Sequence, residues 1–104
     1  MTTTIVNLRG KNIKQWLLDP NNVYIGRARP GVPGSVFRNT YRIGIDGDRD
    51  TVIALYRLRL QQLLQDPEIL EQFIALKGKT LGCWCKPEAC HGDVLVEILD
   101  SLTI

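Results

Sequence analysis

The stretch that decides the fold is KTLGCWCKPEACHGDVLVEIL, Lys79–Leu99, which holds all three cysteines and the only histidine of the chain within nine residues. Its first part, Lys79–Cys85, alternates side chains in the manner of a strand, with Cys83 and Cys85 on one face and Trp84 on the other. Its second part, about 88–102, repeats apolar residues at helical spacing. The stretch therefore predicts a strand, a short turn and a helix, with the cysteines and the histidine at the junction.

The rest of the chain alternates in the same way between strand and helix patterns. Two short apolar runs, Thr4–Leu8 and Val23–Arg27, predict strands, and 12–18 and Asp50–Gln65 predict helices, the latter with Asp50 as its N-cap. A further helix is expected after Asp66 as N-cap and Pro67 at the first helical position. This order predicts an α/β fold: a single domain over 1–104, small and three-layered, with a short, mostly parallel sheet of three or four strands flanked by helices.

Parallel strands place their carboxyl ends at one edge of the sheet, where ligands of open α/β sheets bind. The residues at the first two predicted ends are Asn7 with Arg9, and Gly26 with Arg27. The third end is the cysteine stretch, Cys83, Trp84 and Cys85. A segment of about twenty residues follows the second strand, which is longer than most loops in a compact domain and is typical of a functional loop.

Composition limits the class of protein. A hydrophobic share of 44% and a charged share of 23% are typical of a soluble globular protein and exclude a disordered or fibrous chain. No run of apolar residues approaches a membrane span, and the start lacks a signal-peptide pattern, so we expect a cytoplasmic protein with no membrane partner. Three cysteines, two of them on one strand, do not suggest a secreted disulfide framework.

The positive charge is concentrated in one segment. Seven of the eight arginines lie between positions 27 and 59 together with three aspartates, which leaves that segment net +4, and it contains no lysine. The guanidinium group binds phosphate and carboxylate with two parallel hydrogen bonds. The segment is therefore either an anion clamp or a solvated basic surface.

Three interpretations of the cysteine stretch stay open. Cys83, Cys85, Cys90 and His91 are ligand types that zinc prefers, but structural zinc sites usually space their cysteines by two to four residues, so we assign no metal. Cys90 opens the last helix, where the positive end of the helix favours a thiolate, and His91 and Asp93 are candidates for its base and the partner of that base. Inert packing is the third interpretation, because cysteine is often buried as a small apolar residue.

The sequence also resembles a known family of bacterial and phage proteins. VYIGR, DGDR before a helix with LYR, and CWCKPEACHGDVL are similar to the family catalogued as domain of unknown function 4326, from about Ile5 to Leu99. The resemblance implies motif positions at Asn7, Gly26, Arg27, Asn39, Asp46, Gly47, Arg49, Tyr56, Gly82, Cys83, Trp84, Cys85, Pro87, Cys90, His91, Gly92 and Asp93. Members commonly carry Gly-Asn-Pro-Phe in the middle loop, whereas this chain has Arg38-Asn39-Thr40-Tyr41, which keeps only the asparagine.

Together these observations predict a pocket for a small anionic ligand, such as a nucleotide or sugar phosphate, with Cys90, His91 and Asp93 at the reacting atom. The predicted binding residues are Asn7, Arg9, Gly26, Arg27, Asn39, Asp46, Arg49, Cys83, Trp84 and Cys85. The alternative is a non-catalytic module that binds nucleic acid or protein and whose Cys/His cluster is structural. The absence of a lysine-rich tract and of interleaved aromatics weakens the nucleic-acid alternative. The cofactor, the oligomeric state and whether a reaction follows binding are left open.

Overall fold

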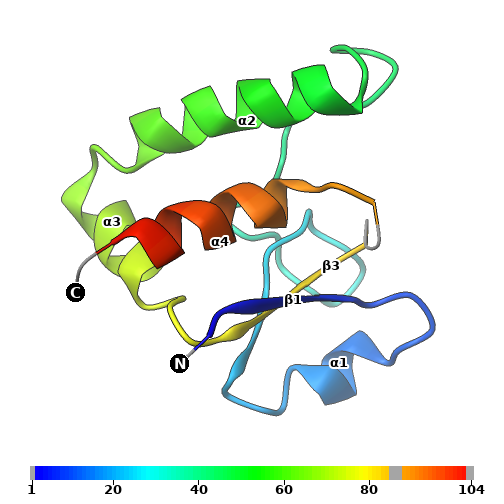
Figure 1. The fold of residues 1–104 in the computed structure, drawn as a ribbon. Helices are drawn as coiled ribbons and strands as arrows, with labels where there is room; N and C mark the ends of the chain where they lie inside the picture. Colours follow the sequence, from blue (N-terminus) through cyan, green and yellow to red (C-terminus); the bar gives the residue numbers. More distant parts are fainter. Residues whose placement is uncertain (1, 85–87, 103–104) are drawn as a thin grey trace.

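The computed structural model describes residues 2–84 and 88–102, arranged as a three-stranded sheet between helices (Figure 1). The elements in chain order are β1 (Thr4–Asn7), α1 (Ile13–Trp16), β2 (Asn22–Tyr24), α2 (Arg49–Leu63), α3 (Pro67–Ile74), β3 (Thr80–Cys83) and α4 (His91–Ser101). The strands lie in the order β1-β3-β2. The predicted small α/β domain is confirmed, with three strands.

Both strand pairs are parallel, and β3 is the central strand. Leu81 of β3 lies opposite Ile5 on one side and Val23 on the other. The three strands therefore run in one direction and end at the same edge of the sheet. This edge carries Cys83 at its centre, and the chain turns from there into α4.

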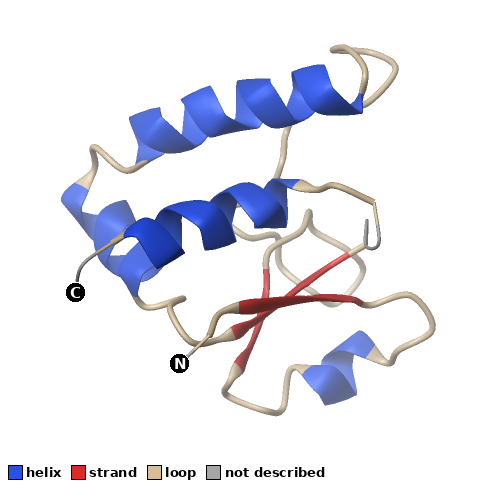
Figure 2. Cartoon of the chain, in the orientation of Figure 1, coloured by secondary structure: helices blue, strands red, loops and turns tan. Residues whose placement is uncertain are grey.

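The alternation of side chains along the strands separates two apolar clusters, one on each face of the sheet. Leu81 and Cys83 face the larger cluster, which includes residues of α2, α3 and α4. Val6 and Leu8 belong to the smaller cluster, with Trp16 of α1. Figure 2 shows the same arrangement: α1 lies on one side of the sheet and the three longer helices on the other. The domain thus has the predicted three layers.

Helix starts follow local capping chemistry, with some boundaries shifted from the prediction. Asp66 accepts a hydrogen bond from Glu68 N at 2.9 Å and Pro67 opens α3, as predicted. The prediction of Asp50 as the cap of α2 is wrong, because Asp48 caps it by accepting from Thr51 N at 2.8 Å. The hydrogen bond to the Thr51 backbone has the larger effect on Asp48 and the one to the Thr51 hydroxyl the smaller, and both lower the pKa of Asp48 below its ordinary value.

Helix α4 begins at His91, with Cys90 as N-cap, three residues later than predicted.

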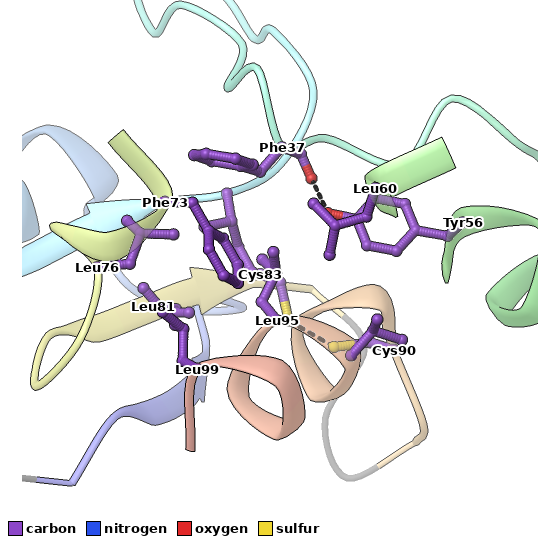
Figure 3. Close-up of a cluster of buried hydrophobic side chains, with 12 residues drawn as sticks. Phe37, Tyr56, Leu60, Phe73, Leu76, Leu81, Cys83, Cys90, Leu95 and Leu99 are labelled. Atoms are coloured by element: carbon purple, nitrogen blue, oxygen red, sulfur yellow. Dashed lines mark hydrogen bonds between the residues drawn. The ribbon is translucent and has the colours of Figure 1, made fainter. Parts of the chain in front are cut away.

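The structure describes the whole of the long segment 25–48, which contains no regular strand. Side-chain contacts hold this segment in place. Two isolated β-bridges lie within it, Arg29 with Val32 and Ile43 with Gly47. Phe37 fills the core with 3% of its surface exposed, and its carbonyl accepts a 2.6 Å hydrogen bond from the Tyr56 hydroxyl (Figure 3). A buried ring and a buried hydrogen bond therefore fix the segment against α2.

Gly82 allows α1 to pack closely on the sheet. A Cβ atom at this position would lie 2.6 Å from Cη2 of Trp16 and 2.8 Å from Cδ1 of Leu8, distances shorter than van der Waals contact. We predict that Gly82→Ala lowers the free energy of unfolding by about 1–3 kcal/mol, because residues of the smaller apolar cluster must shift to make room for the added methyl group. Urea unfolding monitored by circular dichroism measures this loss.

The matching control is a double-mutant cycle with Trp16→Leu. Shortening the side chain at position 16 removes the closest clash, so Gly82→Ala is expected to cost less in that background. Strictly additive losses would show that the contact between Gly82 and Trp16 does not limit the packing.

Candidate functional site

A pocket of about 740 Å³ opens at the carboxyl edge of the sheet. Its walls come from the ends of β2 and β3, from the segment that follows β2, from the first turn of α2 and from the start of α4. These parts are far apart in the sequence and meet because the parallel strands end together. The pocket lies where the strand pattern had placed a ligand site.

Eight of the predicted site residues line this pocket: Gly26, Arg27, Asn39, Arg49, Cys83, Trp84, Cys90 and His91. Asn7, Arg9, Asp46 and Asp93 do not line it. Cys85 lies outside the described residues. The functional roles of all these residues stay predictions, but the structure brings the first eight around one space.

The predicted residues outside the pocket have contacts that organise backbone. Asn7 Oδ1 accepts from Arg9 N at 2.9 Å, where the chain leaves β1. Asp46 Oδ2 accepts from Arg42 N at 2.7 Å and so closes the turn before α2. Asp93 Oδ2 accepts from Cys90 N at 3.0 Å, which is the carboxylate half of a capping box at the start of α4. Each of these polar side chains therefore has a structural contact at a turn or a helix end.

Arg27 holds the middle segment in its path. Its Nε donates to the carbonyl of Asn39 at 2.7 Å, and its Nη2 donates to the carbonyl of Tyr41 at 2.8 Å. The Asn39 side chain in turn accepts from Tyr41 N at 2.9 Å. The Asn39 turn is thus held from both sides.

Arg49 joins the two helix starts that border the pocket. This half-buried residue is the first of α2, and its Nη1 donates to the carbonyl of Ala89 at 2.7 Å, just before α4. Because a carbonyl carries no net charge, the guanidinium keeps its positive charge, and it has five N–H donors in all.

Two arginines that were not singled out from the sequence, Arg29 and Arg42, also line the pocket. The guanidinium carbon of Arg29 lies 4.0 Å from the ring centroid of Trp84, within cation–π distance. Arg42 is exposed. Only the concentration of arginines in segment 27–59 pointed toward these two residues. That concentration alone did not distinguish an anion-binding site from a solvated basic surface.

The lining of the pocket is strongly positive. Four arginines, Arg27, Arg29, Arg42 and Arg49, border the space, and no aspartate or glutamate is among the described residues that line it. A cleft with one sign of charge focuses its field and attracts ions of the opposite sign. The arrangement therefore suits an anion.

The two described cysteines of the wall are in contact with each other. Cys83 Sγ and Cys90 Sγ lie 3.3 Å apart, at the end of β3 and the start of α4 (Figure 3). Their exposed fractions are 1% and 2%, so both belong to the core as much as to the pocket. This contact connects the central strand to the helix that follows it.

His91 connects the same helix to Ile25, the residue that follows β2. Its Nε2 lies 2.8 Å from the carbonyl of Ile25, an acceptor, so Nε2 carries the proton of this hydrogen bond. The imidazole also makes an edge contact with the Tyr56 ring, with centroids 5.0 Å apart. A hydrogen bond to a backbone carbonyl is the structural role that a buried histidine at a helix start can have, and one ring nitrogen takes part in it.

Within residues 2–84 and 88–102 the structure places no three His, Cys, Asp or Glu side chains so that they could hold a metal ion. Of the four candidate zinc ligands, Cys83, Cys90 and His91 fall within these ranges and Cys85 does not. None of the described helices has both the length and the apolar character needed to cross a membrane.

The geometry defines a class: a small parallel α/β protein with an arginine-lined pocket at the carboxyl edge of its sheet. The chain belongs to the family named Domain of unknown function (DUF4326), which it matches over residues 4–101. This match confirms the family resemblance that the sequence indicated.

A curated relative is the "Uncharacterized 12.4 kDa protein in nrdA-td intergenic region" of Enterobacteria phage T4, which is 35% identical to this chain over 57 residues. The matched part is 54% of this chain and 53% of the phage protein, or about half of each. No solved structure matches the chain at a significant level.

Tyr56 offers a test of how the pocket wall is held together. Burial, and next the electrostatic effect of Cys90, raise the pKa of Tyr56 far above its ordinary value, while Arg59 opposes the shift. We predict that Tyr56→Phe lowers the free energy of unfolding at neutral pH by about 1–3 kcal/mol, because the Phe37 carbonyl stays buried without its donor. Urea unfolding at neutral pH measures this difference.

The raised pKa of Tyr56 also predicts the effect of alkaline pH. An unfolded tyrosine loses its proton near pH 10, whereas the folded one keeps it. The contribution of the Tyr56 hydroxyl to the free energy of unfolding is therefore fully present below about pH 10 and decreases as the pH rises above it. The advantage of the wild type over Tyr56→Phe should therefore shrink above about pH 10. Tyr41→Phe, at a half-buried position, serves as control for the chemical change alone. An advantage that stays constant through the alkaline range would contradict the buried hydroxyl.

Proposed function

We propose that this pocket binds a small organic anion, a phosphate ester of the nucleotide or sugar-phosphate kind. The observation that carries the proposal is the lining: four arginines and, among the described lining residues, no carboxylate. A small ligand is favoured over a long polymer because the space is a pocket of about 740 Å³, within the usual range for small-molecule sites.

The contacts of the arginines support the proposal, because they leave the positive charges in place. Arg27 and Arg49 donate to backbone carbonyls, and Arg29 lies over an aromatic ring. The one ion pair among the described residues joins Arg57 to Glu97 and lies away from the pocket lining. Charge-assisted hydrogen bonds from guanidinium groups to phosphate are therefore the interactions that a ligand would gain.

Cys90 and His91 are the groups placed to act on such a ligand. Both border the same space as the four arginines. The hydrogen bond from His91 Nε2 to the Ile25 carbonyl holds the imidazole in place beside the pocket. A reaction at the pocket would therefore use the Cys90 sulfur and the His91 imidazole, and binding would come first.

The test is calorimetric titration of the protein with inorganic phosphate, ribose 5-phosphate and adenosine 5′-monophosphate at low salt. We expect Arg49→Ala to weaken binding roughly tenfold or more, since one charge-assisted hydrogen bond is lost. Arg49 also holds Ala89, so Arg42→Ala is the companion variant: this residue is exposed, and its replacement should weaken binding without a large loss of stability.

Arg57→Ala is the matched control. Arg57 lies on α2 like Arg49, but it pairs with Glu97 on the surface and does not line the pocket. Its replacement should leave the affinity unchanged. An equal loss of affinity in all three variants would mean attraction by net charge alone, and no binding of any probe would refute the proposal.

The nucleic-acid alternative gives a different result in the same experiment. A nucleic-acid-binding module would prefer a single-stranded oligonucleotide to the monophosphate, and its affinity would fall steeply with salt as counterions are released. Such a preference would replace the small-ligand proposal.

A further inference from the structure

We propose that the ligand is a nucleotide whose planar base stacks on the pair formed by Trp84 and Arg29. This inference rests on the proposed function, since it names the ligand class of the same pocket. It is carried by three features of the lining: a fixed aromatic ring, an excess of hydrogen-bond donors, and an apolar wall.

Trp84 is held in one orientation by a short chain of hydrogen bonds. Its Nε1 donates to the Tyr24 hydroxyl at 3.1 Å, and that hydroxyl donates to the Arg27 carbonyl at 2.7 Å. The Tyr24 and Trp84 rings also meet edge to face, with centroids 6.4 Å apart and an angle of 73°. Since Trp84 packs in addition against the smaller apolar cluster, the ring is a rigid platform at the pocket.

Arg29 extends this platform from a fixed backbone. Arg29 N donates to the Val32 carbonyl at 2.9 Å and Val32 N donates back at 2.8 Å, while the Val32 side chain is buried. The exposed Arg29 side chain reaches over Trp84, with the guanidinium carbon 4.0 Å from the ring centroid. Guanidinium groups stack on aromatic faces, so a flat base can add to this pair by stacking on the guanidinium plane.

The donors and acceptors of the lining disfavour a sugar as the main recognised group. Arginine donates hydrogen bonds and accepts none, and the described lining has no carboxylate to receive hydroxyl protons. Asn39 has the only amide side chain of this lining, and its Oδ1 already accepts from Tyr41 N. A ligand rich in acceptors, with a phosphate and ring nitrogens, therefore fits better than one rich in hydroxyl groups.

Exposed apolar side chains complete the wall. Ile43 and Ile45 keep 52% and 79% of their surface exposed, and both border the pocket on the segment before α2. Contiguous apolar surface beside polar groups is typical of ligand-binding grooves. A base covering them would remove apolar surface from water, which a free phosphate could not do.

The experiment compares affinities of the four ribonucleoside 5′-monophosphates with those of ribose 5-phosphate and inorganic phosphate. At least one monophosphate is expected to bind about tenfold or more tightly than ribose 5-phosphate, the gain typical of one stacked base. In a Trp16→Phe background, Trp84 is the only tryptophan, and its fluorescence should change with that monophosphate and stay unchanged with inorganic phosphate.

Variants separate stacking from charge. Trp84→Leu should abolish the preference for the monophosphate over ribose 5-phosphate while the affinity for inorganic phosphate persists. Arg29→Ala, at an exposed position, should reduce the same preference and keeps the test valid if Trp84→Leu does not fold. Arg42→Ala should weaken all three kinds of probe by a similar factor and leave the preference unchanged.

The outcomes distinguish this inference from the proposed function. If inorganic phosphate and ribose 5-phosphate bind as tightly as every monophosphate, the inference is overturned and the anion pocket stands. If no probe binds, both fall. If Arg29→Ala leaves the preference unaltered and the Trp84 fluorescence does not respond to the preferred monophosphate, the base binds elsewhere and the stacking assignment is wrong.

Discussion

The parallel pairing of β3 with both β1 and β2 is the constraint on which the rest of the structure depends. A central strand with two parallel neighbours brings three carboxyl ends to one edge, and here these ends lie within one residue of one another in register. The chain then passes from β3 into α4, so the start of that helix lies at the same edge. Every wall of the pocket is built on this arrangement, including the long segment that leaves β2.

Two arginines of the pocket, Arg27 and Arg49, both bind the backbone and keep an uncompensated positive charge. Arg27 and Arg49 bind backbone carbonyls and thereby hold the middle segment and the loop before α4 in place. Neutral partners leave the positive charge uncompensated, and the planar group has further donors to offer. A lysine could not do both, because its single ammonium group lacks the extended planar fork. The loops of the site are thus positioned by the same charges that would attract its ligand.

The start of α4 shows how a cluster that resembles a catalytic triad in the sequence is distributed in space. Asp93 turns back to the Cys90 backbone, His91 reaches the Ile25 carbonyl, and Cys90 contacts Cys83 across the junction. All three contacts join α4 to its cap or to the sheet. The cluster is therefore a structural joint, and its Cys90 and His91 also form part of the pocket wall. The Tyr56 ring packs on His91 from the side of α2, and its hydroxyl donates to the Phe37 carbonyl.

Local patterns in the sequence determined the order of strands and helices, the alternation of Cys83 and Trp84 across the sheet, the Asp66–Pro67 helix start and the edge at which the site lies. These features depend on neighbouring residues, through side-chain period and capping, so a linear pattern contains them. Tertiary structure alone decided that Arg29 lies on Trp84, that Arg42 joins the pocket and that Asn7, Arg9, Asp46 and Asp93 are outside its lining. Those outcomes depend on how segments more than twenty residues apart meet across the edge of the sheet, and no local spacing encodes that meeting.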